Sequence, residues 1–144
     1  MAEDNIHIRC VSEWMKHASR VPPEELAGLF EKAMTVLWRR TYSALGDITV
    51  AAIVDRVLYN ATEKYSALGS LKLDASGVNF AEFRHHAGSI NDRELKEATQ
   101  FVLVELLTVV GNLTAEILTP ALHAELSSVT VKDLRSKQRG EKKL

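Results

Sequence analysis

DRELKEATQFVLVELLTVVGNLTAEILT, residues 92–119, is the stretch that decides the fold predicted for this chain. Its apolar side chains recur with the spacing of an α-helix, and a helix of this length reaches roughly 40 Å. Apolar side chains cover about two-thirds of its circumference, more than a helix on the outside of a small bundle needs to bury. The polar stripe that remains, about 100° wide, consists of Glu94, Glu97, Glu105, Thr108, Asn112 and Glu116.

Two arrangements would bury so wide an apolar surface. In one, the helix is central to its own domain, and the short segments at 5–18 and 121–128 help to cover it. In the other, a second subunit covers part of it, and twofold symmetry is the commonest way to build such a contact. The second arrangement predicts a homo-oligomer, most simply a dimer. Its interface residues would be Val102, Leu103, Leu106, Leu107, Val110, Leu113 and Ile117.

The preceding segments also have helical spacing. Residues 23–45 follow a proline, which is tolerated in the first turn of a helix, and they end at Gly46. Residues 48–68 are rich in β-branched side chains, which suit a strand. Their apolar positions nevertheless keep helical rather than alternating spacing, so we expect a helix capped by Asp47.

Shorter elements complete the predicted fold. Asn91 and Glu94 have the spacing of a capping box at the start of the long helix. Residues 71–80 fit either a small hairpin or an irregular loop, and the sequence does not choose between them. The sequence therefore predicts an all-α helical bundle. Its long helices are expected at about 23–45, 48–68 and 92–119, and its short helices at 5–18, 79–87 and 120–128.

Composition limits the class of protein. The 144 residues are 46% apolar and 26% charged, with a net charge of −1. These values fit a single domain, expected at 1–128, followed by a charged, flexible tail at 129–144. Neither the overall charge nor the tail, which lacks aromatic residues, indicates specific nucleic-acid binding. The single cysteine, the lack of a signal-peptide pattern and the lack of a long apolar run predict a cytoplasmic protein without a membrane span.

The first candidate site is the sequence AEFRHHAGSIND, residues 81–92, which contains adjacent histidines. Glu82 and His86 lie one helical turn apart, which makes at most half of a metal site. His85 and His86 point about 100° apart on a helix and so rarely bind the same ion. We therefore predict no metal and no cofactor. The remaining histidines are scattered along the chain, at His7, His17 and His123.

The second candidate lies in LWRRTYSAL, residues 37–45. Trp38 and Tyr42 are one turn apart at the edge of the apolar face of their helix, and Arg39 lies beside them. Aromatic and arginine side chains are enriched at binding hot spots, so these three residues are a candidate partner surface. The alternative is that Trp38 only closes the edge of the bundle while the two arginines, Arg39 and Arg40, pair with nearby acids.

No combination of nucleophile, base and oxyanion donor is recognisable, so we predict that the protein is not an enzyme. The expected function is that of a non-enzymatic helical interaction or regulatory module that acts as a homo-oligomer, with a protein partner, in signalling or scaffolding. The alternative is a small-ligand or cofactor binder with a pocket between helices near His85 and His86.

Overall fold

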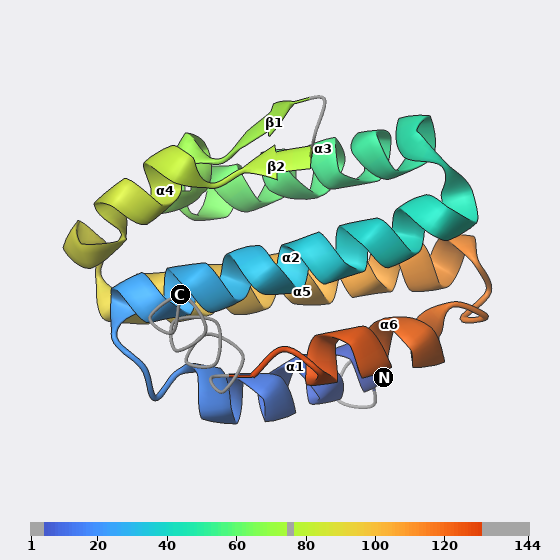
Figure 1. The fold of residues 1–144 in the computed structure, drawn as a ribbon, viewed down its shortest axis with the longest axis horizontal. Coiled ribbons are helices and arrows are strands. Elements are labelled where there is room, and N and C mark those ends of the chain that lie inside the picture. The colour runs from blue at the N-terminus through green and yellow to red at the C-terminus, as the bar shows by residue number, and fades with distance from the viewer. Residues whose placement is uncertain (1–4, 75–76, 131–144) are drawn as a thin grey trace, which may run out of the picture.

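The computed structural model describes residues 5–74 and 77–130, and it confirms the predicted all-α bundle (Figure 1). The three long helices are α2 (Pro23–Leu45), α3 (Asp47–Lys64) and α5 (Asp92–Leu113). The shorter ones are α1 (Ile6–Ala18), α4 (Ala81–His86) and α6 (Thr119–Ser127), with 3-10 turns η2 (Ser66–Ser70) and η3 (Ala87–Ser89).

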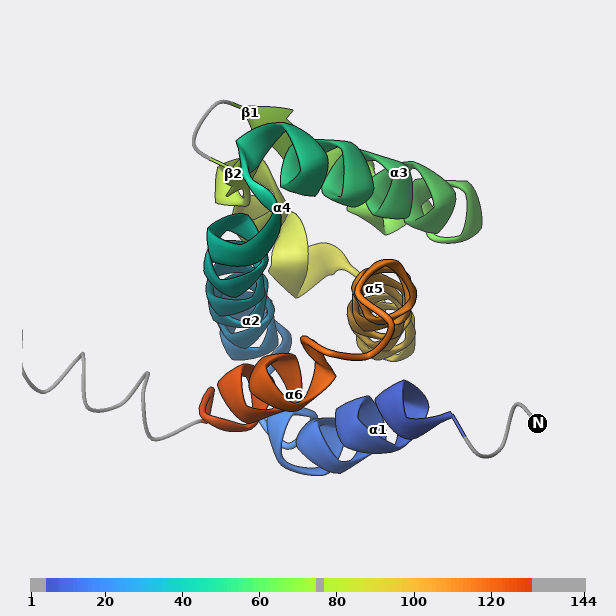
Figure 2. The same cartoon turned by 90° about the vertical axis from the view of Figure 1, so that its right-hand side faces the viewer.

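The elements form three layers (Figure 2). Helices α2 and α5 lie side by side in the middle layer. Helix α3 and the hairpin cover one side of it, and α1 and α6 cover the other. Helix α5 contacts α1, α2, α3 and α6. It is therefore the central helix of its own domain.

The wide apolar surface of α5 is buried by the chain itself. Val102, Leu103, Leu106, Leu107 and Val110 are each at most 2% exposed. The covering residues of α1 are Val11, Trp14 and Met15, which are buried as well. These five α5 residues are buried in the core of the single chain. They therefore have no exposed surface through which a second subunit could make the expected interface. The other two residues of that set remain on the surface, Leu113 at 61% and Ile117 at 82% exposure.

Helix α5 ends at Leu113, earlier than the expected 119, because the backbone turns there. Ala115 and Glu116 adopt left-handed conformations with φ of 51° and 63°, which residues other than glycine rarely adopt. The Glu116 N–H donates to the Gly111 carbonyl at 2.7 Å, and the Ala115 N–H donates to the Asn112 carbonyl at 3.3 Å. These two bonds form a Schellman ending with alanine at the position usually taken by glycine, which explains why the sequence did not indicate it.

The ends of other elements also refine the sequence prediction. Asn91 caps α5 as expected, accepting from the Glu94 N–H at 3.1 Å. Asp47 does not cap α3: it is the first residue of that helix, and its carboxylate accepts from the adjacent Ile48 N–H. Helix α3 stops at Lys64 instead of continuing to 68, and η2 follows it.

Of the two alternatives for residues 71–80, the structure contains the hairpin. Strands β1 (Lys72–Asp74) and β2 (Gly77–Asn79) pair antiparallel, with Leu73 opposite Val78. Gly77 has a φ of 122°, which favours glycine, and it packs beside Trp38 of α2. The hairpin is thus held against the middle of α2.

Beyond α6, Val129 is buried and its carbonyl accepts a hydrogen bond from the Trp14 indole at 2.8 Å. The packed chain therefore passes the expected boundary at 128. The rest of the predicted tail, residues 131–144, lies outside the described residues. Within 5–74 and 77–130, no helix combines the length and the apolar character needed to cross a membrane.

The burial of α5 predicts opposite results for two leucines of that helix. Leu106→Ala should lower the free energy of unfolding by about 2–5 kcal/mol, because it leaves a cavity in the core. Leu113→Ala is the matched control and should change it by less than about 0.5 kcal/mol, since Leu113 is exposed. Urea denaturation followed by circular dichroism measures both. Equal losses at the two positions would contradict this account of the core.

Candidate functional site

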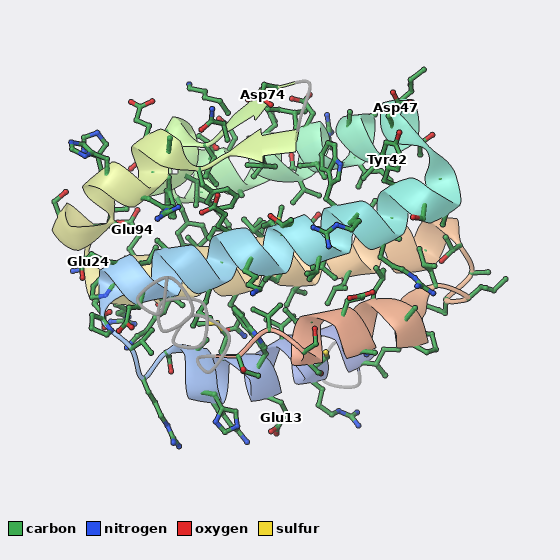
Figure 3. The ribbon with its side chains drawn as sticks, in the orientation of Figure 1. Glu13, Glu24, Tyr42, Asp47, Asp74 and Glu94 are labelled. Atoms are coloured by element: carbon green, nitrogen blue, oxygen red, sulfur yellow. The ribbon has the colours of Figure 1, made fainter. Side chains whose placement is uncertain are left out.

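A shallow groove of about 280 Å³ lies between α2 and the hairpin. The structure brings Trp38, Arg39 and Tyr42, the predicted partner surface, together along one wall of this groove. Figure 3 shows Tyr42 on the side of α2 toward the hairpin. Met34 and Phe80 are buried beneath the groove, while Tyr42 is 50% exposed. The groove thus has an apolar floor and an aromatic, basic rim.

The basic side chain of this rim, Arg39, is exposed and belongs to no ion pair among the described residues. The same holds for Arg40, which follows it on α2 but does not line the groove. Arg84, by contrast, is paired with Glu31 at 2.9 Å. The expectation that nearby acids would pair with the α2 arginines is therefore wrong for the described chain.

The histidine pair of the first candidate site lies elsewhere. Glu82, His85 and His86 are all exposed on α4. The two imidazole rings meet edge to face, with their centres 5.1 Å apart. None of the three residues lines the groove. The structure therefore does not connect these histidines with the pocket that the alternative function requires.

Three other titratable residues, which the sequence left scattered, meet in the structure. His7 of α1 lies between Glu116 of the α5–α6 turn and His123 of α6. The distance from His7 Nε2 to Glu116 Oε1 is 3.1 Å, and that from His7 Nδ1 to His123 Nε2 is 2.9 Å. The Thr119 hydroxyl donates to the same Glu116 oxygen. We call these four side chains the His7 network.

The ionised carboxylate of Glu116 determines which ring nitrogens of His7 and His123 carry protons in this network. The hydrogen bond from Thr119, and to a smaller degree that from His7, holds the pKa of Glu116 below its usual range. The ionised carboxylate can only accept, so His7 Nε2 carries a proton. In the neutral pair, His7 Nδ1 then accepts from the Nε2–H of His123. Burial, followed by charge on His7, lowers the pKa of His123, although Glu116 opposes the shift.

The His7 network can pass a proton along its length, but it is not arranged for nucleophilic catalysis. A catalytic dyad or triad places a hydroxyl or thiol on the imidazole base. Here the hydroxyl of Thr119 donates to the carboxylate instead. Cys10 is half-buried, and burial raises the pKa of its thiol, which disfavours the reactive thiolate.

Sequence separation explains why the network was missed. His7 is 109 residues from Glu116 and 116 residues from His123. One signal does exist, namely Gly111 within an apolar helix, where glycine costs about 1 kcal/mol relative to alanine. A Cβ on Gly111 would lie 2.6 Å from Glu116 Oε1 and 2.8 Å from His7 Nε2. A methyl group there would have to displace Glu116 and the buried His7, so glycine allows the close approach of the two side chains.

In the part of the chain that the structure describes, no group of three or more His, Cys, Asp or Glu side chains is placed to hold a metal ion. Comparison with known proteins adds no further indication of function. No protein-family model, curated protein or solved structure matches this chain.

The close packing at Gly111 predicts that Gly111→Ala is destabilising. A glycine-to-alanine change inside a helix ordinarily stabilises it by about 1 kcal/mol. Here the added methyl would displace Glu116 from His7, so we expect the free energy of unfolding to fall by about 1 kcal/mol. The neighbouring Asn112→Ala is the control and should cost less than about 0.5 kcal/mol. Urea denaturation at pH 7.5 measures the free energy of unfolding of both variants. A Gly111→Ala protein that is more stable than the wild type would contradict the close packing.

Proposed function

We propose that this protein is a non-enzymatic interaction module that binds a segment of a partner protein in the groove between α2 and the hairpin. The observation that carries the proposal is the position of Tyr42 and Arg39, both exposed, over the buried Met34 and Phe80. Tyrosine, tryptophan and arginine around an apolar pocket are the typical composition of a binding hot spot.

The size of the groove favours a side chain of a larger partner over a small molecule. Pockets that enclose a small ligand usually measure about 300–1,000 Å³. The groove, at about 280 Å³, lies at the lower end of this range and is partly open to solvent. It can take one or two side chains of a chain that continues over the surface. The alternative function, a small-ligand or cofactor binder near His85 and His86, receives no support from the positions of those residues.

The charge of the rim specifies the partner further. Arg39, which lines the groove, is exposed and has no acidic partner within the described residues. A guanidinium group forms paired hydrogen bonds with a carboxylate, which adds geometric specificity to charge attraction. The partner segment therefore combines a large apolar or aromatic side chain, which enters the groove, with an acidic residue beside it.

Homo-oligomer formation stays a prediction and is not part of this proposal. That prediction depends on the wide apolar surface of α5, and most of this surface faces the chain's own core. A signalling or scaffolding role and a cytoplasmic location are proposals as well. The first depends only on the fold class, and the second on the single cysteine and the composition.

Selection from a library of random peptides displayed on phage tests the proposed function. Peptides retained by the wild-type protein, but not by a Tyr42→Ala, Arg39→Glu double variant, should share an aromatic or large aliphatic residue next to an acidic one. Binding of one such synthetic peptide, measured by fluorescence polarisation, should weaken about tenfold or more with either single substitution.

Two residues of α3 supply matched controls for this experiment. Tyr59 is 63% exposed and Arg56 is exposed, and neither lines the groove. Tyr59→Ala and Arg56→Glu should leave the affinity unchanged. The proposal fails if no shared motif is enriched, or if the groove variants and the α3 variants bind the selected peptide equally.

A further inference from the structure

The first turn of α1 is held to the rest of the molecule through a single buried side chain. His7 is 3% exposed, whereas its neighbours Ile6 and Ile8 are 46% and 39% exposed. Asn5 caps the turn by accepting from the N–H groups of His7 and Ile8, which orders the turn internally. The attachment to the α5–α6 turn and to α6 is made by the imidazole of His7.

Counting protons shows when this attachment can exist. With both imidazoles neutral, His123 donates to His7 and His7 donates to Glu116, so each close pair has one donor and one acceptor. With one added proton, His7 donates from both nitrogens and His123 accepts, so the pairs are still matched. With two added protons, His7 Nδ1–H and His123 Nε2–H face each other 2.9 Å apart without an acceptor. Two positive charges also meet there.

We propose that the His7 network is a proton-operated latch, which holds the first turn of α1 against the α5–α6 turn and α6, and which releases that turn when both imidazoles are protonated. The latch is distinct from the proposed groove. It involves α1, α6 and the end of α5, and none of its residues lines the groove.

Among residues 5–74 and 77–130, few charged groups lie beside the latch. On the α1 side the titratable group is His7 itself, on the α6 side it is His123, and from the α5–α6 turn it is Glu116. The charges that act on His123 are those of His7 and Glu116. Helix α5 contributes the uncharged Gly111 beside the pair. The response of the latch to pH is therefore that of two coupled imidazoles beside one carboxylate.

The direction of the pH response follows from proton linkage. The lowered pKa of His123 means that the closed latch binds fewer protons than the open one. The closed state is therefore fully favoured above the ordinary histidine pKa of about 6.5, and it loses this advantage as the pH falls below that value toward the lowered pKa. The lowered pKa of Glu116 acts separately, because that carboxylate is protonated only at more acidic pH.

The turn that carries Glu116 is suited to release. Ala115 and Glu116 hold left-handed conformations, which are unfavourable for residues other than glycine. In the closed state, the hydrogen bonds that Glu116 accepts from His7 and Thr119 offset this strain. Once His7 leaves, Glu116 loses one of these bonds. We therefore expect the first turn of α1 and residues 114–118 to open together.

Hydrogen exchange, corrected for the intrinsic effect of pH on the exchange rate, tests the latch. Between pH 7.5 and 5.5, one extra proton taken up by the open state should lower the protection of amides 7–10 and 116–118 about tenfold. Amides of α3, such as those of Val54 and Val57, should keep their protection, since the opening is local. Unchanged protection at 7–10 over this range would overturn the proposal, as would an equal loss across α3.

His123→Gln separates protonation from simple loss of contact. The glutamine amide can donate to His7 Nδ1 as the imidazole does, but it does not titrate, so the pH-dependent loss of protection should disappear. His17→Gln is the control, because His17 is exposed on α1, outside the His7 network, and its replacement should leave the tenfold loss intact. A His123→Gln protein that opens like the wild type would overturn the latch. If that variant does not fold, the nitrogen-15 chemical shifts of the imidazoles in the wild-type protein provide the test. We expect them to show the second protonation below pH 6.5, over the same pH range as the loss of amide protection. Loss of protection without that protonation would overturn the latch.

Discussion

The arrangement of the other helices depends on the burial of α5. An α-helix that is apolar over most of its circumference must be covered on several sides, and α5 is covered by α1, α2, α3 and α6 of the same chain. Each neighbour therefore has a fixed place. Helices α2 and α5 form the middle layer, α3 closes one side of it, and α1 with α6 closes the other.

Helices α1 and α6 cover the side of α5 opposite α3, and this packing buries a polar side chain. The start of α1 must reach the end of α5, and it does so with His7, a side chain that is stable in a buried position only when both ring nitrogens have partners. Glu116 and His123 supply those partners. The Schellman ending of α5 turns the chain so that Glu116 faces His7. Packing and titration are therefore coupled at one end of the bundle.

The sequence predicted the helices well because apolar periodicity and capping are local. The spacing in residues 92–119 identified α5, and Asn91 identified its first residue. The same information could not locate its last residue, since Ala115 adopts a conformation that glycine usually takes. Nor could it choose between one chain and two as the cover for Leu106, because that depends on how distant segments pack.

The candidate sites, like the fold, were predictable only where the residues involved are close in the sequence. Trp38, Arg39 and Tyr42 are neighbours on one helix, so their common surface was predictable, whereas the packing of the hairpin against them was not. The His7 network joins His7 to residues more than 100 positions away, and Gly111 is the one local signal of it. His85 and His86 were candidate site residues because they are adjacent in the sequence, but both are exposed in the structure.

The central claim is that one chain buries α5 without a second copy. Urea unfolding of the wild-type protein at two concentrations a hundredfold apart tests it most directly. A chain that folds alone has the same unfolding midpoint at both concentrations, and this is the result we predict. A midpoint that rises with protein concentration would show that association contributes to the folded state, and it would contradict folding of the single chain without a second copy.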